Sequence, residues 1–216
     1  PSGPDRPRVE TDPPRPVSAY GRSKLAAEEA VRAAAARLPA AIVRPPNVLG
    51  PGSKEIEAAI GLLRLRLSPS VGDARLRTSL IDVDDLVASL ILASEHPLAA
   101  GRTYFVTDGG AYAWPEIVSA LADELGTGRF RIRVPYGLQL AAAGLAEAFS
   151  RATGRPPRLT RDIVRAGHDH FWLYNGSSIV RDLGFRPRHT MRDAVRRAVA
   201  DTAGSPGRRG ARRTGP

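Results

Sequence analysis

A tyrosine and a lysine lie four residues apart in "PVSAYGRSKLAAEEAV", residues 16–31. The pattern predicts a helix over Ser18–Arg37 with Ser18 as its N-cap, so Tyr20 and Lys24 share one helix face. A phenol beside an ammonium suits proton transfer, because the cation stabilises the phenolate. Lowering a tyrosine pKa from about 10 to about 7 takes roughly 4 kcal/mol. A neighbouring cation supplies about 1–3 pKa units, so a second positive charge, such as an oxidised nicotinamide ring, would complete the shift. On spacing alone, the alternative is a solvated helix face.

Composition excludes several kinds of site. The 216 residues include no cysteine and four histidines, which rules out disulfides and thiolate metal sites. No apolar run approaches the roughly 20 residues of a membrane span, so we expect a cytoplasmic protein without a membrane partner. The formal net charge is +10, but four arginines are concentrated in the last 13 residues. We interpret residues 204–216 as a disordered basic tail, and a nucleic-acid arm would instead require salt-dependent DNA binding.

Strand and helix patterns alternate along the chain. Strands are predicted at Ala40–Val43, Leu76–Ile81 and in "RTYFVTDGG", and helices at Ile56–Leu67, Val83–Glu95 and in "WPEIVSALADELG". This alternation with apolar strands is typical of a mostly parallel sheet covered by helices, which is an α/β fold.

The character changes after Gly126. "FRIRVP" predicts a strand, "YGLQLAAAGLAEAFSRATG" an amphipathic helix, and the following stretch short helices and turns around aromatic residues. We expect residues 127–203 to form mainly a smaller cap beside the sheet. Its side chains His168, Phe171, Trp172 and Tyr174 could line a substrate pocket, but the cap's own core is the preferred interpretation.

Several blocks in order give a specific resemblance. "PVSAYGRSKLAAEEAV", "AAIVRPPNVLGPG" and "SLIDVDDLVASLILA" resemble the extended short-chain dehydrogenases/reductases of the NAD-dependent epimerase/dehydratase family. The segment with "RDLGFRPRHTMRDAVRRAV" resembles the branch near 3β-hydroxysteroid dehydrogenases and dihydroflavonol reductases. The resemblance implies a Rossmann-type doubly wound parallel sheet with a small mixed C-terminal substrate cap. Residues 1–15 would be a loop, and 16–126 the C-terminal part of the dinucleotide-binding domain.

The resemblance also implies roles for residues at matching positions. Tyr20 would be the catalytic acid/base, and Lys24 would bind the nicotinamide ribose of NAD or NADP and lower the tyrosine pKa. The backbone of Pro46, Asn47 and Val48 would face the nicotinamide carboxamide. Asn47 would also contact substrate, or else only satisfy a turn.

Charged residues in the next block are candidates for binding a substrate diphosphate or a metal ion. Arg77 stands near the arginine with which sugar-nucleotide members bind diphosphate. Asp82, Asp84 and Asp85 could suggest Mg²⁺ or Ca²⁺. We instead expect no metal, with Asp84 and Asp85 capping the helix that they begin.

Some family features do not occur in this sequence. It has no G-x-x-G-x-x-G phosphate motif, and Ser2 stands too close to Tyr20 to be the family's third catalytic residue. We therefore expect an N-terminally truncated member that lacks central strands, is poorly stable or oligomeric alone, and binds NAD(P) weakly or not at all.

Two function classes remain. The first is an NAD(P)-dependent oxidoreductase or epimerase acting on a secondary alcohol or ketone, either a sugar nucleotide or, slightly favoured, a sterol-like or flavonoid-like compound. The alternative is a catalytically incomplete binding or scaffold module. Family resemblance implies a small-molecule substrate and is compatible with a homodimer through the helix that carries Tyr20.

Overall fold

The computed structural model describes residues 2–3, 5–35, 37–70, 75–128, 130–154, 159–169 and 171–204. From residue 205 on, the expected basic tail lies outside the described residues. The elements are α1 (Ala19–Ala34), β1 (Ile42–Arg44), β2 (Asn47–Leu49), α2 (Lys54–Arg64), β3 (Leu67–Ser70), β4 (Leu80–Asp82), α3 (Val83–Glu95), the 3₁₀ turn η1 (Pro97–Ala99), β5 (Thr103–Phe105), α4 (Trp114–Glu124), β6 (Phe130–Arg133), α5 (Tyr136–Thr153), α6 (Arg161–Asp169), α7 (Ser177–Leu183) and α8 (Met191–Gly204).

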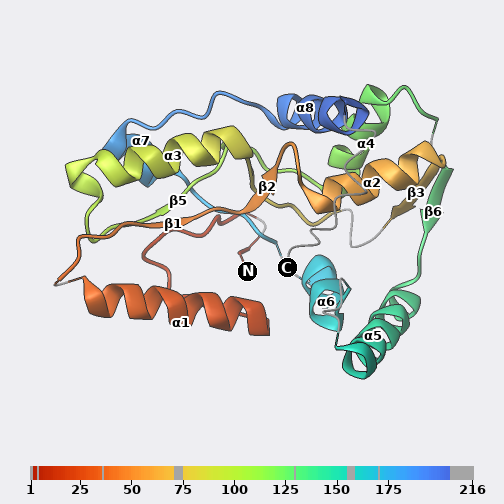
Figure 1. The fold of residues 1–216 in the computed structure, drawn as a ribbon, viewed down its shortest axis with the longest axis horizontal. Coiled ribbons are helices and arrows are strands. Elements are labelled where there is room, and N and C mark those ends of the chain that lie inside the picture. The colour runs from red at the N-terminus through yellow and green to blue at the C-terminus, as the bar shows by residue number, and fades with distance from the viewer. Residues whose placement is uncertain are drawn as a thin grey trace, which may run out of the picture.

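The strands pair in parallel. β1 pairs with β5, β2 with β4, and β3 with β6. In Figure 1, β1 and β5 form a middle layer, with α3 and α7 above it and α1 below. Parallel pairing between distant segments, with helices on both faces, agrees with the predicted α/β class.

Two hydrophobic cores lie on opposite sides of β4. Successive strand residues point to opposite faces, and Leu80 packs into one core while Ile81 packs into the other. The Leu80 core joins α2, α4 and α8 through residues such as Ile60, Leu121 and Val195. The Ile81 core contains members of β5 and α7, including Tyr104 and Ile179.

The N-terminal segment is attached to residues 171–175. Arg8 N–H donates to the Leu173 carbonyl, and Asn175 N–H donates to the Arg8 carbonyl, both at 2.8–2.9 Å. Glu10 reaches further into the fold, where its carboxylate accepts from Phe105 N–H at 2.9 Å and from the Ser178 hydroxyl at 3.0 Å. The expected loop is therefore attached both to β5 and to the segment from Leu173 to Ser178.

Among the helices that the structure describes, none combines the length and apolarity needed to cross a bilayer. Helix α3 and the start of α5 match their predicted positions. Other boundaries were wrong: α1 ends at Ala34, α2 covers Lys54–Arg64, and Leu67 belongs to β3. Asn47–Leu49 forms β2, a strand that is not among those predicted from the sequence. How the chain divides into domains at residue 126 stays a prediction.

Candidate functional site

Tyr20 and Lys24 lie on the first turns of α1. Ser18 is the N-cap, as predicted, because its hydroxyl accepts from Gly21 N–H at 3.0 Å. The Lys24 ammonium lies over the Tyr20 ring, 5.5 Å from the ring centroid. The tyrosine side chain is 71% exposed. This is a cation–π contact between the ammonium and the face of an accessible phenol ring, and it holds the two side chains together on one face of α1.

α1 itself is held by charge rather than by burial, since none of its residues is buried. Glu28 forms a bidentate pair with Arg44 of β1, at 2.8 Å to Nε and 2.6 Å to Nη2. Arg32 adds a third contact at 2.7 Å. Hydrogen bonding to Arg44 lowers the pKa of Glu28. This ion pair fastens the helix that carries Tyr20 to the sheet.

The Pro46–Val48 segment leads from β1 into β2. Asn47 is exposed, and its amide donates to the Thr78 hydroxyl at 2.9 Å. Val48 stands opposite Ile81 in the β2–β4 register. Asn47 is thus oriented by a neighbouring strand segment while its surface stays accessible.

Arg77 is paired with a carboxylate. Its guanidinium lies 2.5 Å from Glu116 at the start of α4, and both side chains are over 40% exposed. Glu116 also accepts from Ala113 N–H at 3.0 Å, and this bond, with Arg77, lowers the Glu116 pKa. Glu116 therefore neutralises the positive charge of Arg77 that would be needed to bind a diphosphate.

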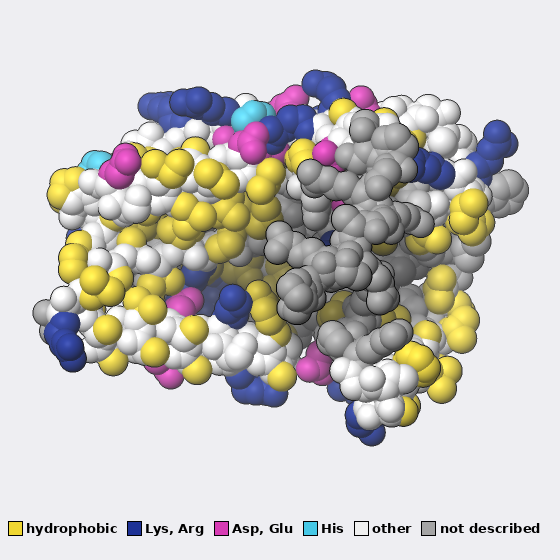
Figure 2. Space-filling model, in the orientation of Figure 1, with side chains coloured by type: hydrophobic (Ala, Val, Ile, Leu, Met, Phe, Trp, Pro, Cys, Tyr) yellow, Lys and Arg dark blue, Asp and Glu magenta, His cyan; other side chains and the backbone are white. Residues whose placement is uncertain are grey.

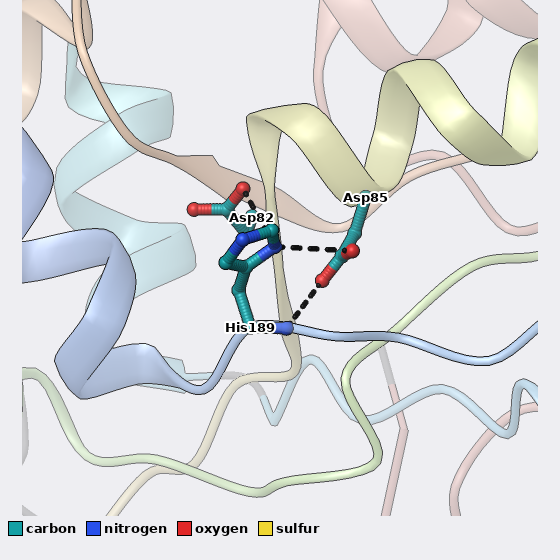
Figure 3. Close-up of side chains that lie close together, drawn as sticks. All are labelled: Asp82, Asp85 and His189. Atoms are coloured by element: carbon teal, nitrogen blue, oxygen red, sulfur yellow. Dashed lines mark hydrogen bonds and ion pairs between the residues drawn. The ribbon is translucent and has the colours of Figure 1, made fainter.

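A buried polar cluster joins α3 to the segment before α8 (Figure 3). Asp82 and Asp85 are 1–2% exposed, and ligand atoms of Asp82, Asp85 and His189 lie within 4.8 Å of one another. Asp85 accepts from Arg188 N–H at 3.0 and 3.1 Å and from His189 N–H at 2.9 Å. Its carboxylate is therefore satisfied by backbone donors.

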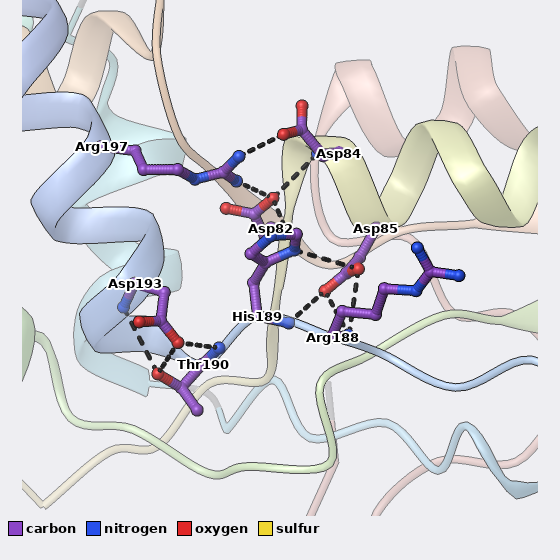
Figure 4. A network of polar contacts seen from close by, with 8 residues as sticks. All are labelled: Asp82, Asp84, Asp85, Arg188, His189, Thr190, Asp193 and Arg197. Atoms are coloured by element: carbon purple, nitrogen blue, oxygen red, sulfur yellow. Dashed lines mark hydrogen bonds and ion pairs between the residues drawn. The ribbon is translucent and has the colours of Figure 1, made fainter.

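Arg197 of α8 completes this cluster by binding both Asp82 and Asp84 (Figure 4). Asp82, not Asp84 or Asp85, is the N-cap of α3, accepting from Asp84 N–H at 2.8 Å. Asp84 and Asp85 do lie in the first turn, where acids complement the helix dipole as expected, but the expectation that they cap the helix was wrong. The second Asp82 oxygen has no hydrogen-bond partner and points away from Asp85 and His189 (Figure 3). We interpret the cluster as a fastening between α3 and α8, since its inward oxygens already bind a guanidinium and N–H groups.

The aromatic residues divide between two places. Tyr174 is half-buried, and its ring stacks on Phe105 with centroids 4.6 Å apart. His168 lies against Tyr136 of α5 with ring centroids 4.3 Å apart, and its Nε2 is 3.2 Å from Gln139 Oε1. His168 therefore contacts residues within the expected cap, whereas Tyr174 packs on a β5 residue outside it. Whether these side chains form the cap's own core stays a prediction.

Sequence reasoning missed Glu10, His189 and Arg197. Each acts on a partner about 95 or more residues away, so no local spacing could reveal it. A local signal existed only for Asp82, which directly precedes the helix beginning with Val83.

Comparison with known proteins decides the family. Residues 1–107 match the model of the NAD dependent epimerase/dehydratase family. The chain belongs to this family. A second finding agrees on the fold, which is of the Rossmann type. The structure of MoeE5 in complex with UDP-glucuronic acid and NAD superposes with a TM-score of 0.72 at 24% identity, covering 94% of this chain and 62% of that one.

Two curated relatives of this epimerase/dehydratase chain are reductases. The ceramide reductase of Caulobacter vibrioides is 34% identical over 143 residues, which are 65% of this chain and 44% of that protein. The 2-alkyl-3-oxoalkanoate reductase of Stenotrophomonas maltophilia is 27% identical over 198 residues, which are 85% of this chain and 58% of that protein. The chain thus spans about half the length of these two relatives.

Proposed function

We propose that Tyr20 and Lys24 are the proton-transfer pair of an NAD- or NADP-dependent oxidoreductase or epimerase that acts on a secondary alcohol or ketone. The observation that carries the proposal is the Lys24 ammonium held over the exposed Tyr20 ring on one face of α1. Membership of the NAD dependent epimerase/dehydratase family supports it.

The surroundings of Lys24 are compatible with a bound nicotinamide cofactor. Among the described residues, no carboxylate lies within ion-pair distance of the Lys24 ammonium, so its N–H groups remain available for ribose hydroxyls. Pro46, Asn47 and Val48 would lie along the nicotinamide, and Asn47 would contact substrate. When bound, the cofactor supplies or accepts hydride. Tyr20 would give its phenolic proton to a carbonyl oxygen or take one from a hydroxyl.

An apolar ketone is the substrate class that we favour. A sugar nucleotide brings a diphosphate, and Arg77 already pairs with Glu116, which would repel that anion. The name of the 2-alkyl-3-oxoalkanoate reductase also supports a ketone substrate, although MoeE5 was solved with UDP-glucuronic acid. A cytoplasmic location and a homodimer through α1 stay predictions that belong to this proposal.

Fluorescence titration of NADH and NADPH tests the cofactor role. The sample is this chain, beside any longer form that its gene encodes. The matched variants are Lys24→Met and Lys54→Met, because these are the two lysines of the sequence. We expect Lys24→Met to weaken binding at least tenfold in whichever form binds, while Lys54→Met binds like wild type. Equal affinities for the two variants would contradict the role of Lys24.

A further inference from the structure

The attachment of α1 to the sheet depends on one arginine side chain. In Figure 2, acidic and basic side chains lie between α1, at the lower left, and the elements above it. Glu28 of α1 accepts two hydrogen bonds from the Arg44 guanidinium, and no residue of α1 is buried. The position of Tyr20 and Lys24 on this helix therefore depends on how firmly the Arg44 side chain is held.

Phe105 of β5 supports the Arg44 side chain. The two residues stand opposite each other in the β1–β5 register, and the guanidinium carbon lies 5.5 Å from the centroid of the Phe105 ring. A guanidinium is attracted to an aromatic face and keeps its N–H groups for hydrogen bonds in its own plane. The contact with Phe105 thus leaves Nε and Nη2 of Arg44 to bind Glu28.

The Phe105 ring is held in turn by Tyr174, from the segment between α6 and α7. The two ring centroids are 4.6 Å apart and the planes meet at 33°. The backbone of Phe105 is held separately, because its N–H donates to Glu10 at 2.9 Å. Tyr174 is itself fixed where its N–H donates to the Ser79 hydroxyl at 3.1 Å. The contact with Tyr174 therefore sets the orientation of the Phe105 ring rather than the course of β5.

We propose that Tyr174 is a positioning residue for the proton-transfer pair on α1 and acts through Phe105 and Arg44. This role rests on the proton-transfer function proposed above. Burial raises the pKa of the Tyr174 phenol, so near neutral pH the residue contributes a neutral ring and no second acid or base. Through these contacts a segment of the expected substrate cap sets the place of the proton donor.

Hydrogen exchange at the α1 amides tests this connection. We expect Tyr174→Leu to accelerate exchange in α1 at least about fivefold, because the Phe105 ring loses its support, and Tyr174→Phe to keep the wild-type rate. Tyr136→Leu is the matched control, since Tyr136 is also a cap tyrosine in ring contact, with His168 at 4.3 Å. The amides of α4, which belongs to the Leu80 core, report global unfolding. Unchanged α1 exchange in Tyr174→Leu would overturn the proposal.

Two further readouts separate positioning from general destabilisation. Arg44 and Arg32 lower the pKa of Glu28, so carbon-13 NMR titration of the Glu28 carboxyl should show its pKa rising toward 4.5 in Tyr174→Leu but not in Tyr136→Leu. In a Glu28→Gln background, Tyr174→Leu should change α1 exchange by less than about twofold, because the shared connection is already broken. Full effects of both changes in the double variant would contradict a connection through Arg44.

Turnover links the positioning role to catalysis. In a form that reduces a ketone, we expect kcat of Tyr174→Leu to fall about tenfold and Tyr174→Phe to restore it, since a displaced Tyr20 transfers its proton poorly. A wild-type kcat beside faster α1 exchange would overturn the positioning role. If the wild-type protein turns over no ketone, the proposed function fails, and α1 exchange with the Glu28 titration still decides whether Tyr174 holds α1.

Discussion

Replacing Asp85 by asparagine should destabilise the protein far more than the same change at its neighbour Asp84. Asp85 is 2% exposed; its Oδ2 accepts from the N–H groups of both Arg188 and His189, and its Oδ1 shares the Arg188 N–H at 3.1 Å. Hydrogen bonds to a charged group contribute about 1.5–3 kcal/mol each. Asparagine keeps one acceptor and turns an N–H donor toward another N–H. We expect a loss of about 2–4 kcal/mol, from one bond and the donor–donor contact.

Thermal unfolding followed by circular dichroism measures this loss. For a domain of this size, 1 kcal/mol corresponds to about 2–4 °C in Tm, so Asp85→Asn should melt roughly 5–12 °C below wild type. Asp84 has a side chain 61% exposed and contacts Arg197, so Asp84→Asn should cost less than about 1 kcal/mol. Hydrogen exchange should accelerate at the amides of residues 188 and 189 in the Asp85 variant. Equal melting of the two variants, or unchanged exchange at those amides, would refute the fastening role.

Three further outcomes are expected. Glu28→Gln should loosen the attachment of α1 and lower the free energy of unfolding by about 1–2 kcal/mol at neutral pH. The pKa of Glu28 is lowered in the fold. The stabilisation from the Glu28 carboxylate is therefore present above the ordinary pKa of 4.5 and is lost as the pH falls through the pKa of the folded state. The gap in unfolding free energy between wild type and Glu28→Gln should therefore close in acid, and a constant gap would contradict the ion pair. Gly50→Ala should lower the free energy of unfolding, measured in denaturant, by over about 2 kcal/mol, because φ is 139° and the new Cβ would lie 2.6 Å from Val83 Cγ1. Gly52→Ala has open space around the new Cβ, so it should lower that free energy by only about 1 kcal/mol. Arg77→Ala should leave turnover of an apolar ketone within about threefold of wild type in steady-state assays, and a loss confined to sugar nucleotides would favour that substrate class instead.

Local chemistry made part of this fold predictable. The Ser18 N-cap, the helix beginning at Val83 and the helix over α5 follow from capping residues and apolar periodicity that act within a few residues. The Tyr20–Lys24 contact is likewise one helical turn.

Distant partners made the rest unpredictable. The two prolines before Asn47 argue against a strand there, yet Asn47–Leu49 forms β2 because it pairs with β4, over 30 residues away. From the sequence Asp85 resembles a capping residue, but in the structure its carboxylate accepts N–H groups from the segment with His189, 104 positions later. From the sequence Arg77 resembles an anion-binding arginine, but in the structure its guanidinium forms an ion pair with Glu116. In each case the deciding contact is tertiary, and a single sequence carries no spacing that records it.

The most direct test of the Tyr20–Lys24 claim is the rate of NAD(P)H oxidation with a long-chain aliphatic ketone, measured for wild type and Tyr20→Phe in a form that binds cofactor. Phenylalanine keeps the ring beneath the Lys24 ammonium and removes only the proton donor. We expect cofactor affinity to be unchanged and kcat to fall by about 10²–10⁴-fold. A Tyr20→Phe protein that turns over at the wild-type rate would contradict the account.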